Sequence, residues 1–387
     1  MKKKEINSAR MPVYRDSGFE LYNAGLTEET FKRETENERD PGNYIYSRYR
    51  NPTVVSAEEE IMKIEECRWA LLTQSGMSAI DTAVSVFQQG KATGPWLFFS
   101  EIYGGSISFV ESILKQRRGI DIQYFTPNNG SYNLAELELV ISKLKPRFVY
   151  IESISNPMLV VADVPSIVSI AGKYDCRVII DNTFATPLLY KPLADGADMV
   201  IHSVTKYLSG HGNITAGVIC GNDDNLMHSA IEYRKFTGHM ISPDDAYRLQ
   251  SQVLTFKLRF SRQCENASKL SAFLNMHPAI ERVWFPGLDK HETHSVAKKL
   301  FGNRGYGAMI TFDLKGRDKA EKREKRDRFI DRVTDTIKLI PTLGDPHTIL
   351  MPVEAVWGTK YPEPGMIRLS VGFEDYEILE KTISGAL

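Results

Sequence analysis

Short apolar runs alternate with segments of helical spacing through the first part of the chain. Each run has the length of a strand, and the segments between the runs place apolar residues at helical intervals. This alternation predicts an α/β fold in which a mostly parallel sheet is covered by helices on both faces. The runs are Ala70–Thr73, Trp96–Phe99, Ile120–Phe125, Phe148–Ile151, Val178–Ile180, Met199–Ile201 and Ala216–Cys220, and helical spacing is clear at Val54–Glu66, Ile107–Gln116, Leu134–Leu144 and Pro165–Tyr174.

The pattern changes near residue 235, and the remainder predicts a second, smaller α/β domain. A helical pattern runs from Ala246 to about Leu274, and strand patterns follow at Ala308–Phe312 and Ile367–Val371. Residues 1–55 are polar and rich in Glu, Arg and Asn, so we expect an arm rather than part of a core. The expected division is an arm at 1–55, a large domain at 56–235 and a C-terminal domain at 236–387.

Composition and charge are those of an ordinary soluble protein. The chain has 387 residues, of which 42% are hydrophobic and 25% charged, and its formal net charge is −1. Such a charge gives no long-range attraction to nucleic acid or a membrane surface, and no apolar stretch is long enough to cross a bilayer. The basic residues 2–4 precede no apolar segment, so no signal peptide is expected. The four cysteines form no C-x-x-C pair, which favours reduced thiols in a cytoplasmic protein.

Two further patterns have an ordinary explanation that we prefer. Residues 315–332 carry a dense run of mixed charges, which predicts a solvated helix with i,i+4 pairs. A nucleic-acid patch is the alternative, but no aromatic residues are interleaved. His291 and His294 have a spacing compatible with metal ligation, yet no third ligand is evident, so we expect surface side chains and no metal.

Candidate functional residues follow several predicted strands at the point where each strand ends. They are Tyr103, the segment Glu152–Pro157, the segment Asp181–Thr183, and Lys206. The carboxyl ends of parallel strands meet at one edge of a sheet, where ligands of such folds bind. The turn Ser75–Ser78 adds a small-residue helix start, whose backbone N–H groups and dipole attract an anion.

Lys206 has two interpretations. It is either an exposed lysine, as most lysines are, or a lysine that forms a Schiff base with the aldehyde of pyridoxal phosphate. The second interpretation requires partners for the cofactor and for an amino-acid substrate. The chain offers Asp181 for the ring nitrogen, Tyr103 for the ring face and Arg368 for the substrate carboxylate. The phosphate donors would be the backbone N–H groups of Gly76 and Met77 and the hydroxyls of Ser203 and Thr205.

Seven motifs, in order over nearly the whole chain, resemble those of the Cys/Met-metabolism family of pyridoxal-phosphate enzymes. That family includes cystathionine γ-synthase, cystathionine lyases, methionine γ-lyase and homoserine sulfhydrylases. The resemblance implies a fold type I pyridoxal-phosphate transferase-like architecture. The motifs are Tyr46-Ser-Arg48 before Asn-Pro-Thr, Ser75-Gly-Met-Ser, Tyr103-Gly-Gly, Glu152-Ser-Ile-Ser-Asn156-Pro, Asp181-Asn-Thr183-Phe-Ala-Thr-Pro, Ser203-x-Thr-Lys206-Tyr and Arg368-Leu-Ser-Val-Gly-Phe-Glu-Asp.

The resemblance also implies a role for each matching residue. Lys206 would hold the cofactor and move protons, Asp181 would hold the pyridine nitrogen, and Tyr103 would stack on the ring and act as acid and base. Tyr46 and Arg48 would reach the phosphate of a neighbouring subunit, so the arm would help to build the active site of a dimer within a homotetramer. The other expected cofactor contacts are Gly76, Met77, Asn156, Thr183, Ser203 and Thr205, and the expected substrate contacts are Thr342 and Arg368.

The chain departs from the family pattern mainly in its C-terminal part. Thr342 stands where the family has Ser, and Ser251–Phe256 replaces the usual Arg-Gly-Leu-Lys-Thr-Leu. Val356-Trp-Gly replaces Thr-His, and the loop from there to Arg368 is short. These departures lie where the side chain of a substrate is expected.

The implied activity is that of a carbon–sulfur lyase acting on a sulfur amino acid, cystathionine or methionine, by α,γ- or α,β-elimination. Within the same chemistry, the alternative is a γ-replacement transferase of the cystathionine γ-synthase or O-acylhomoserine sulfhydrylase type. A catalytically silent binding protein is the alternative from another class, and the intact pair of Lys206 and Asp181 argues against it.

Overall fold

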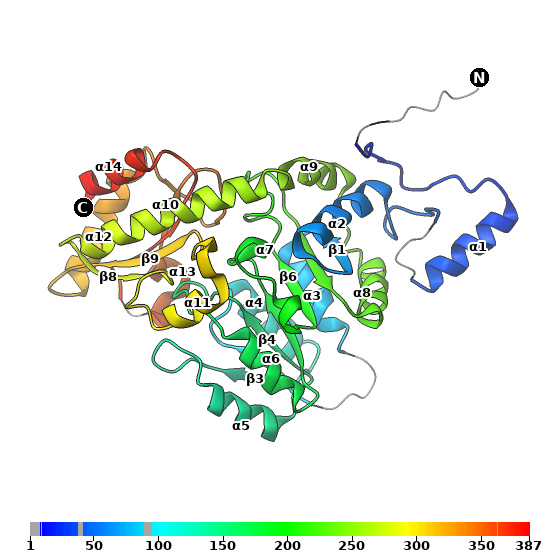
Figure 1. Cartoon of the computed structure of the whole chain (residues 1–387), viewed down its shortest axis with the longest axis horizontal. Helices are drawn as coiled ribbons and strands as arrows, with labels where there is room; N and C mark the ends of the chain where they lie inside the picture. The colour runs from blue at the N-terminus through cyan, green and yellow to red at the C-terminus, as the bar shows by residue number, and fades with distance from the viewer. Residues whose placement is uncertain (1–7, 9, 38–41, 89–93, 362) are drawn as a thin grey trace.

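Two β-sheets organise the part of the chain that the structure describes (Figure 1). The computed structural model describes residues 8, 10–37, 42–88, 94–361 and 363–387. Residues 1–7, on which the expected absence of a signal peptide rests, lie outside this part. Across the described ranges, no helix is both long and apolar enough to cross a membrane.

The larger sheet has seven strands in the order β1-β7-β6-β5-β4-β2-β3. Neighbouring strands from β6 to β3 pair in parallel, whereas β7 pairs antiparallel with both β6 and β1. The predicted mostly parallel sheet is therefore confirmed. The strands are β1 Trp69–Thr73, β2 Trp96–Phe99, β3 Ile122–Phe125, β4 Phe148–Glu152, β5 Arg177–Asp181, β6 Met199–His202 and β7 Gly217–Gly221.

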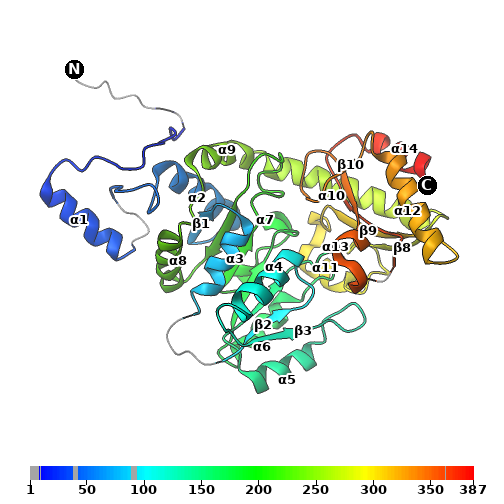
Figure 2. The same ribbon diagram turned by 180° about the vertical axis from the view of Figure 1, so that it is seen from behind.

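Helices surround this sheet (Figure 2). Helices α2 and α8 pack on β1, α3 packs on β6 and β7, and α6 packs on β5. The predicted helix at 107–116 is a short α-helix, α4, that continues as a π-helical turn, η1. The helices are α2 Pro52–Glu65, α3 Gly76–Ser85, α4 Gly104–Phe109, η1 Val110–Lys115, α5 Leu134–Leu144, α6 Val164–Gly172, α7 Thr186–Leu189, η2 Pro192–Asp195 and α8 Asp224–Thr237.

The C-terminal part is built on a five-stranded sheet in the order β10-β11-β12-β9-β8. Its strands are β8 Ile280–Trp284, β9 Met309–Leu314, β10 Lys338–Leu339, β11 Ile349–Pro352 and β12 Met366–Ser370. Its helices are α9 Pro243–Val253, α10 Phe256–Met276, α11 His294–Phe301, η3 Gly302–Arg304, α12 Lys319–Val333, α13 Val353–Trp357, η4 Gly358–Lys360 and α14 Tyr376–Ala386.

The single long helix predicted from Ala246 to about Leu274 is wrong, because α9 ends at Val253 and α10 begins at Phe256. Side-chain hydrogen bonds replace helical ones at the break. The Arg259 guanidinium donates to the carbonyl of Gln252 (2.9 Å) and to Oγ1 of Thr255 (3.1 Å). The same guanidinium donates to the carbonyls of Tyr207 and Leu208, directly after Lys206. The break thus places a buried cation behind the segment that carries the lysine.

Most of the run of charges at 315–332 lies in α12, Lys319–Val333, and the buried residues of this helix are Phe329, Ile330 and Val333. The solvated helix predicted there is confirmed. The expectation that His291 is a surface residue is wrong, since its side chain is buried and contacts Thr293 through Nδ1 (3.2 Å). No group of three or more metal-ligating side chains occurs within the residues that the structure describes.

The N-terminal segment extends away from the two sheets and carries helix α1, Ala24–Thr35 (Figure 1). It is attached to the body at a few points. The N–H of Tyr14 donates to Oγ1 of Thr53 (3.0 Å), and Nζ of Lys235 approaches Oε1 of Glu34 (3.2 Å).

A buried ion pair joins α8 to α2 and β1. Arg234 donates to Oε1 of Glu58 and to the carbonyl of Leu72, and the same carboxylate oxygen accepts the N–H of Leu72 (2.9 Å). Both charged side chains are almost completely buried. Since β1 leads directly into the turn at Ser75, this pair fixes the strand that positions the start of α3.

We expect Glu58→Gln to lower the free energy of unfolding by about 3 kcal/mol, because it leaves the buried charge of Arg234 without its partner. Chemical unfolding of the purified protein measures the change. Glu59→Gln, on the exposed side of the same helix, is the matched control and changes this energy by less than about 0.5 kcal/mol. Equal stability of the two variants would contradict a structural role for the pair.

Candidate active site

A cavity of about 240 Å³ lies at the carboxyl ends of the parallel strands, where the C-terminal part meets the large sheet. It brings together residues far apart in the sequence. Of the predicted site residues, Gly76, Met77, Tyr103, Asn156, Asp181, Thr183, Ser203, Thr205, Lys206, Thr342 and Arg368 line it. Tyr46 and Arg48 are absent from its lining.

Lys206 follows β6 and projects its amine into the cavity. Nζ donates a hydrogen bond to Oγ1 of Thr342 (2.7 Å), which comes from the C-terminal part. Burial, assisted by the charge of Arg368 and opposed by that of Asp345, lowers the pKa of the Lys206 ammonium to about 8. About a tenth of the amine is therefore neutral at pH 7, far more than for an ordinary lysine, and the neutral amine is the nucleophilic form.

Asp181 is the last residue of β5 and is 8% exposed. Its carboxylate accepts the hydroxyl (2.6 Å) and the N–H (3.0 Å) of Thr183 and the hydroxyl of Tyr150 (3.3 Å). Burial raises the pKa of Asp181, whereas the hydrogen bonds from Thr183 and Tyr150 favour its charged form. The hydroxyl of Thr183 also accepts the N–H of Ser203 (2.8 Å), so it connects β5 to the segment that carries the lysine.

The start of α3 forms a site suited to a phosphate. Ser75 caps the helix by accepting the N–H of Ser78 (3.0 Å), which leaves the N–H groups of Gly76 and Met77 at the cavity. A side chain at position 76 would meet Cβ and Oγ of Ser203 at 3.0 Å, so glycine permits the close approach of these two segments. The Thr205 hydroxyl is already engaged, since it exchanges hydrogen bonds with the backbone of Ala216.

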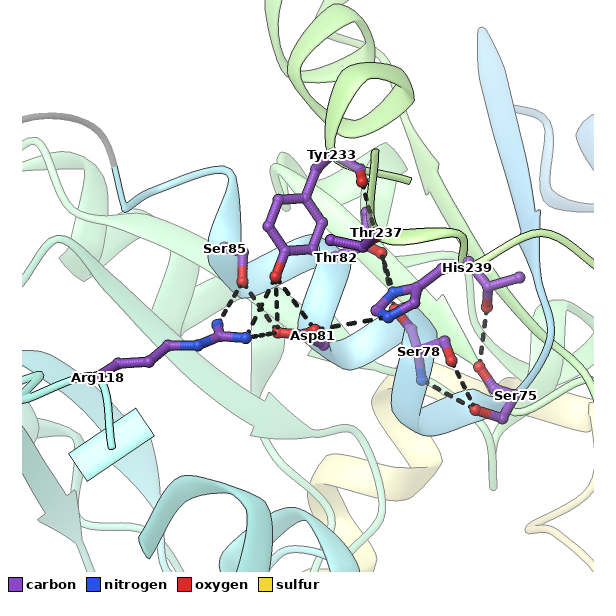
Figure 3. Close-up of polar contacts among 10 residues, drawn as sticks. Ser75, Ser78, Asp81, Thr82, Ser85, Arg118, Tyr233, Thr237 and His239 are labelled. Carbon is purple, nitrogen blue, oxygen red and sulfur yellow. Dashed lines mark hydrogen bonds and ion pairs between the residues drawn. The ribbon is translucent and has the colours of Figure 1, made fainter. Parts of the chain in front are cut away.

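A polar network holds the other face of α3 in place (Figure 3). Asp81 forms an ion pair with Arg118 (2.9 Å) and accepts the hydroxyl of Tyr233 from α8 (3.2 Å). At the next residue, Oγ1 of Thr82 contacts Nδ1 of His239 at 3.3 Å. The helix that begins at this turn is thus bonded to α8, to the turn after η1 and to the loop after α8.

Arg368 from β12 reaches the cavity from the C-terminal sheet. Its two terminal nitrogens donate to Oδ1 of Asn156 and to the carbonyl of Thr342, each at 3.0 Å. Its guanidinium lies 5.5 Å from the ring centroid of Trp357, a residue of the segment that departs from the family pattern. Nε is buried and has no hydrogen-bond partner among the described residues. The guanidinium lines the cavity, and its charge suits the carboxylate of an amino acid.

Tyr103 and Glu152 complete one wall of the cavity. Tyr103 is 51% exposed and stands at the start of α4, where its N–H donates to Oε1 of Glu152 (2.6 Å). Glu152 belongs to one of the predicted motifs but had no expected role. The sequence feature that could have identified it is the one that identified Asp181, an acidic residue directly after an apolar run.

Tyr46 and Arg48 lie on the arm, outside the cavity of their own chain. Arg48 donates to the carbonyl of Lys235 (2.6 Å), and its guanidinium lies 4.9 Å from the ring centroid of Tyr49 and 5.4 Å from that of Tyr46. Tyr46 is 40% exposed. Their expected role therefore requires a second copy of the chain.

The residues present fit pyridoxal phosphate. The cavity offers the Lys206 amine, whose pKa is lowered, and the buried carboxylate of Asp181 on the neighbouring strand. It also offers backbone N–H groups at the start of α3, where a Cβ on Gly76 would crowd Ser203. The Arg368 guanidinium on the cavity wall adds a cation for an amino-acid carboxylate.

Comparison with known proteins agrees with this chemistry. Residues 1–387 match a family model described as "Cys/Met metabolism PLP-dependent enzyme". The chain is 35% identical over 381 residues to an L-methionine gamma-lyase of Fusobacterium nucleatum subsp. polymorphum, which spans 95% of this chain and 90% of the relative. It is 32% identical over 356 residues to a cystathionine beta-lyase of Coxiella burnetii, which spans 89% and 87%.

A solved structure shows the same fold. The crystal structure of cystathionine gamma synthase from Xanthomonas oryzae pv. oryzae in complex with aminoacrylate and cysteine superimposes with a TM-score of 0.84 at 26% sequence identity. The superposition covers 97% of this chain and 92% of that chain. The family resemblance and the fold class inferred from the sequence are both confirmed.

Lys206→Ala is expected to abolish the visible absorption band of bound cofactor, since Lys206 is the only lysine lining the cavity within the described ranges. Lys173→Ala, on a surface lysine paired with Glu138, is the control and keeps the band. Capture of the aldehyde by the apoprotein accelerates as pH rises to about 8, because the neutral amine is the nucleophile. An unchanged spectrum for Lys206→Ala would refute the assignment.

Proposed function

This chain belongs to the Cys/Met metabolism PLP-dependent enzyme family and is a pyridoxal-phosphate enzyme of sulfur amino-acid metabolism, and from that premise we propose that it is a carbon–sulfur lyase. The proposed substrates are the thioether amino acids methionine and cystathionine, and the products are a 2-oxo acid, ammonia and a thiol. The two lyases named above support this choice of reaction.

The proposal rests on one observation: the Lys206 amine, whose pKa is lowered, and the Arg368 guanidinium, which would bind the substrate, lie in the same cavity. Lys206 and Arg368 both line it, and Thr342 bonds to each of them. An amino acid held by its carboxylate at Arg368 therefore lies beside the amine that must remove its Cα proton. Both groups are mostly buried, which strengthens these interactions relative to water.

We assign the cofactor contacts as follows. Lys206 binds the aldehyde, Asp181 the ring nitrogen, and Tyr103 the ring face. The backbone N–H groups of Gly76 and Met77 and the hydroxyl of Ser203 bind the phosphate, with Thr205, Thr183 and Asn156 as further contacts. When bound, pyridoxal phosphate supplies an aldehyde that condenses with amines and a ring that withdraws electrons from the substrate Cα.

The chain's own residues then hold and move the protons. Arg368 orients the substrate by its carboxylate, and the bonds from Thr183 favour the charged form of Asp181 against the effect of burial. Nζ of Lys206 accepts the Cα proton while the hydroxyl of Thr342 keeps the amine in place. The hydroxyl of Tyr103, at the exposed side of the cavity, donates a proton to the departing sulfur.

A γ-replacement transferase is the second candidate. It would use the same residues but an activated homoserine, and a thiol rather than water would complete the reaction. The similarity to a cystathionine gamma synthase favours it. Trp357, in the segment that departs from the family pattern, lies next to Arg368, which would hold the carboxylate of either type of substrate.

We also propose that the active site is shared between two copies of the chain, in a dimer that forms part of a tetramer. The exposed arm supports this, because Tyr46 and Arg48 lie outside their own cavity and present a cation and a hydroxyl. A cytoplasmic location is proposed as well, and the four free thiols support it.

Product analysis tests the reaction. The purified protein is incubated with cystathionine, methionine, homocysteine, and O-acetylhomoserine plus sulfide. We expect a 2-oxo acid and ammonia from at least one thioether, in equal amounts with a thiol, since elimination releases the thiol and water then hydrolyses the remaining unsaturated amine to the other two. Lack of any 2-oxo acid would exclude the lyase, and a replacement product from O-acetylhomoserine alone would establish the second candidate.

Complementation tests the shared site. Arg48→Ala and Lys206→Ala are each expected to be nearly inactive, because each removes one part of the same site. When the two are co-expressed, each mixed dimer contains one site with both residues intact. Activity then returns to about a quarter of the wild-type value, since half of randomly formed dimers are mixed. Activity no higher than that of Arg48→Ala alone would contradict an active site built from two chains.

A further inference from the structure

Glu152 and Asp181 are two acidic residues that face each other at the edge of the large sheet. They are directly paired in the parallel register of β4 and β5, and side chains paired in this way project from the same face. Both line the cavity, and Glu152 is 5% exposed. Asp181 has a role in the proposed function, whereas Glu152 has none.

The hydrogen bonds around the two carboxyl groups are unequal. Asp181 accepts three hydrogen bonds, two from Thr183 and one from Tyr150. Glu152 accepts one, from the N–H of Tyr103 at 2.6 Å. Hydrogen bonds from donors stabilise the charged form of a carboxyl group. The surroundings therefore favour the anion at Asp181.

Two buried carboxylates at neighbouring positions do not both ionise readily. Burial and the charge of Asp181, with a smaller contribution from Glu101, raise the pKa of Glu152 well above its usual value. The N–H of Tyr103 and the charge of Lys360 oppose this rise. The titratable groups that interact with Glu152, from every element around it, are Tyr150, Asp181, Glu101, Tyr132, Lys360 and Tyr361.

We propose that Glu152 is a positioning residue that carries a proton: its neutral carboxyl holds the backbone of Tyr103 and leaves Asp181 as the anion of the pair. A second negative charge at Glu152 would draw a proton onto Asp181 and weaken its hold on a ring nitrogen. The Tyr103 N–H fixes the start of α4, so the same carboxyl also sets where the Tyr103 ring stands. The positioning role of Glu152 rests on the proposed cofactor site, whereas the protonation of its carboxyl group can be measured without the cofactor assignment.

Infrared difference spectroscopy of the full-length protein as purified detects the proton. A protonated carboxyl has a carbonyl band that a carboxylate lacks. We expect this band at neutral pH in the wild-type protein and its loss in Glu152→Gln, whose amide preserves shape and neutrality. The matched control is Glu101→Gln, a buried carboxyl that follows the neighbouring strand β2 and is paired with Lys360 (3.0 Å), and it should keep the band. A band that is missing from the wild type, or lost in Glu101→Gln instead, would overturn the proposal.

The pH dependence of stability gives a second test. A carboxyl whose pKa is raised by folding stabilises the native state fully below its unfolded value and loses this contribution as pH rises through the folded value. Glu152→Gln cannot lose a proton. The melting temperature of the wild type relative to Glu152→Gln should therefore fall steadily as pH rises above 4.5, the usual value for this carboxyl. A difference that is independent of pH would overturn the proposal.

These results separate the proposal from the proposed function. If Lys206→Ala keeps its visible band while the Glu152 infrared band is present, the cofactor assignment fails and the protonated carboxyl stands. If the cofactor band depends on Lys206 but no Glu152 proton is found, the proposed function stands and the positioning role fails.

Discussion

The hydroxyl of Thr183 forms the contact on which the geometry of the site depends. It donates to Asp181 at 2.6 Å and accepts the N–H of Ser203 at 2.8 Å, so it bonds two neighbouring strand ends at once. Asp181 and Lys206 belong to different strands, and a parallel sheet fixes their strands but not the loops that follow. The Thr183 hydroxyl restricts that freedom. It acts beside the backbone bond from the N–H of Asn182 to the carbonyl of Ile201 (2.8 Å), and together these bonds hold the two strand ends in a fixed relation.

The C-terminal part completes the site rather than merely covering it. Thr342 accepts the hydrogen bond of the lysine, and Arg368 donates across the cavity to Asn156 of the large sheet. The close packing is visible at Gly344, where a Cβ would lie 2.7 Å from the backbone of Lys206. Burial by this part of the chain is what lowers the pKa of the amine. The reactivity of Lys206 is therefore a property of the tertiary structure.

Much of the fold and cavity could be predicted because the apolar runs end where polar residues begin. Asp181 and Lys206 lie at such strand ends, and the parallel arrangement follows from the alternation of elements. Glu152 was a candidate without a predicted role, because the role proposed for it depends on the strand that lies next to it, and strand order is a tertiary property. The break in the predicted long helix depends on Arg259, whose side chain replaces helical hydrogen bonds. Tyr46 and Arg48 have no place in a single-chain cavity, so their role remains a prediction.

The network behind α3 has a consequence for ligand recognition. Asp81, Thr82 and their partners hold the helix on the side away from the cavity, while Ser75 caps its first turn (Figure 3). The backbone N–H groups of the proposed phosphate site are thus oriented before any ligand arrives. The conformational entropy of ordering this turn is lost during folding and not during binding, which leaves more of the intrinsic attraction available as affinity. The proposed phosphate site is in this sense preorganised.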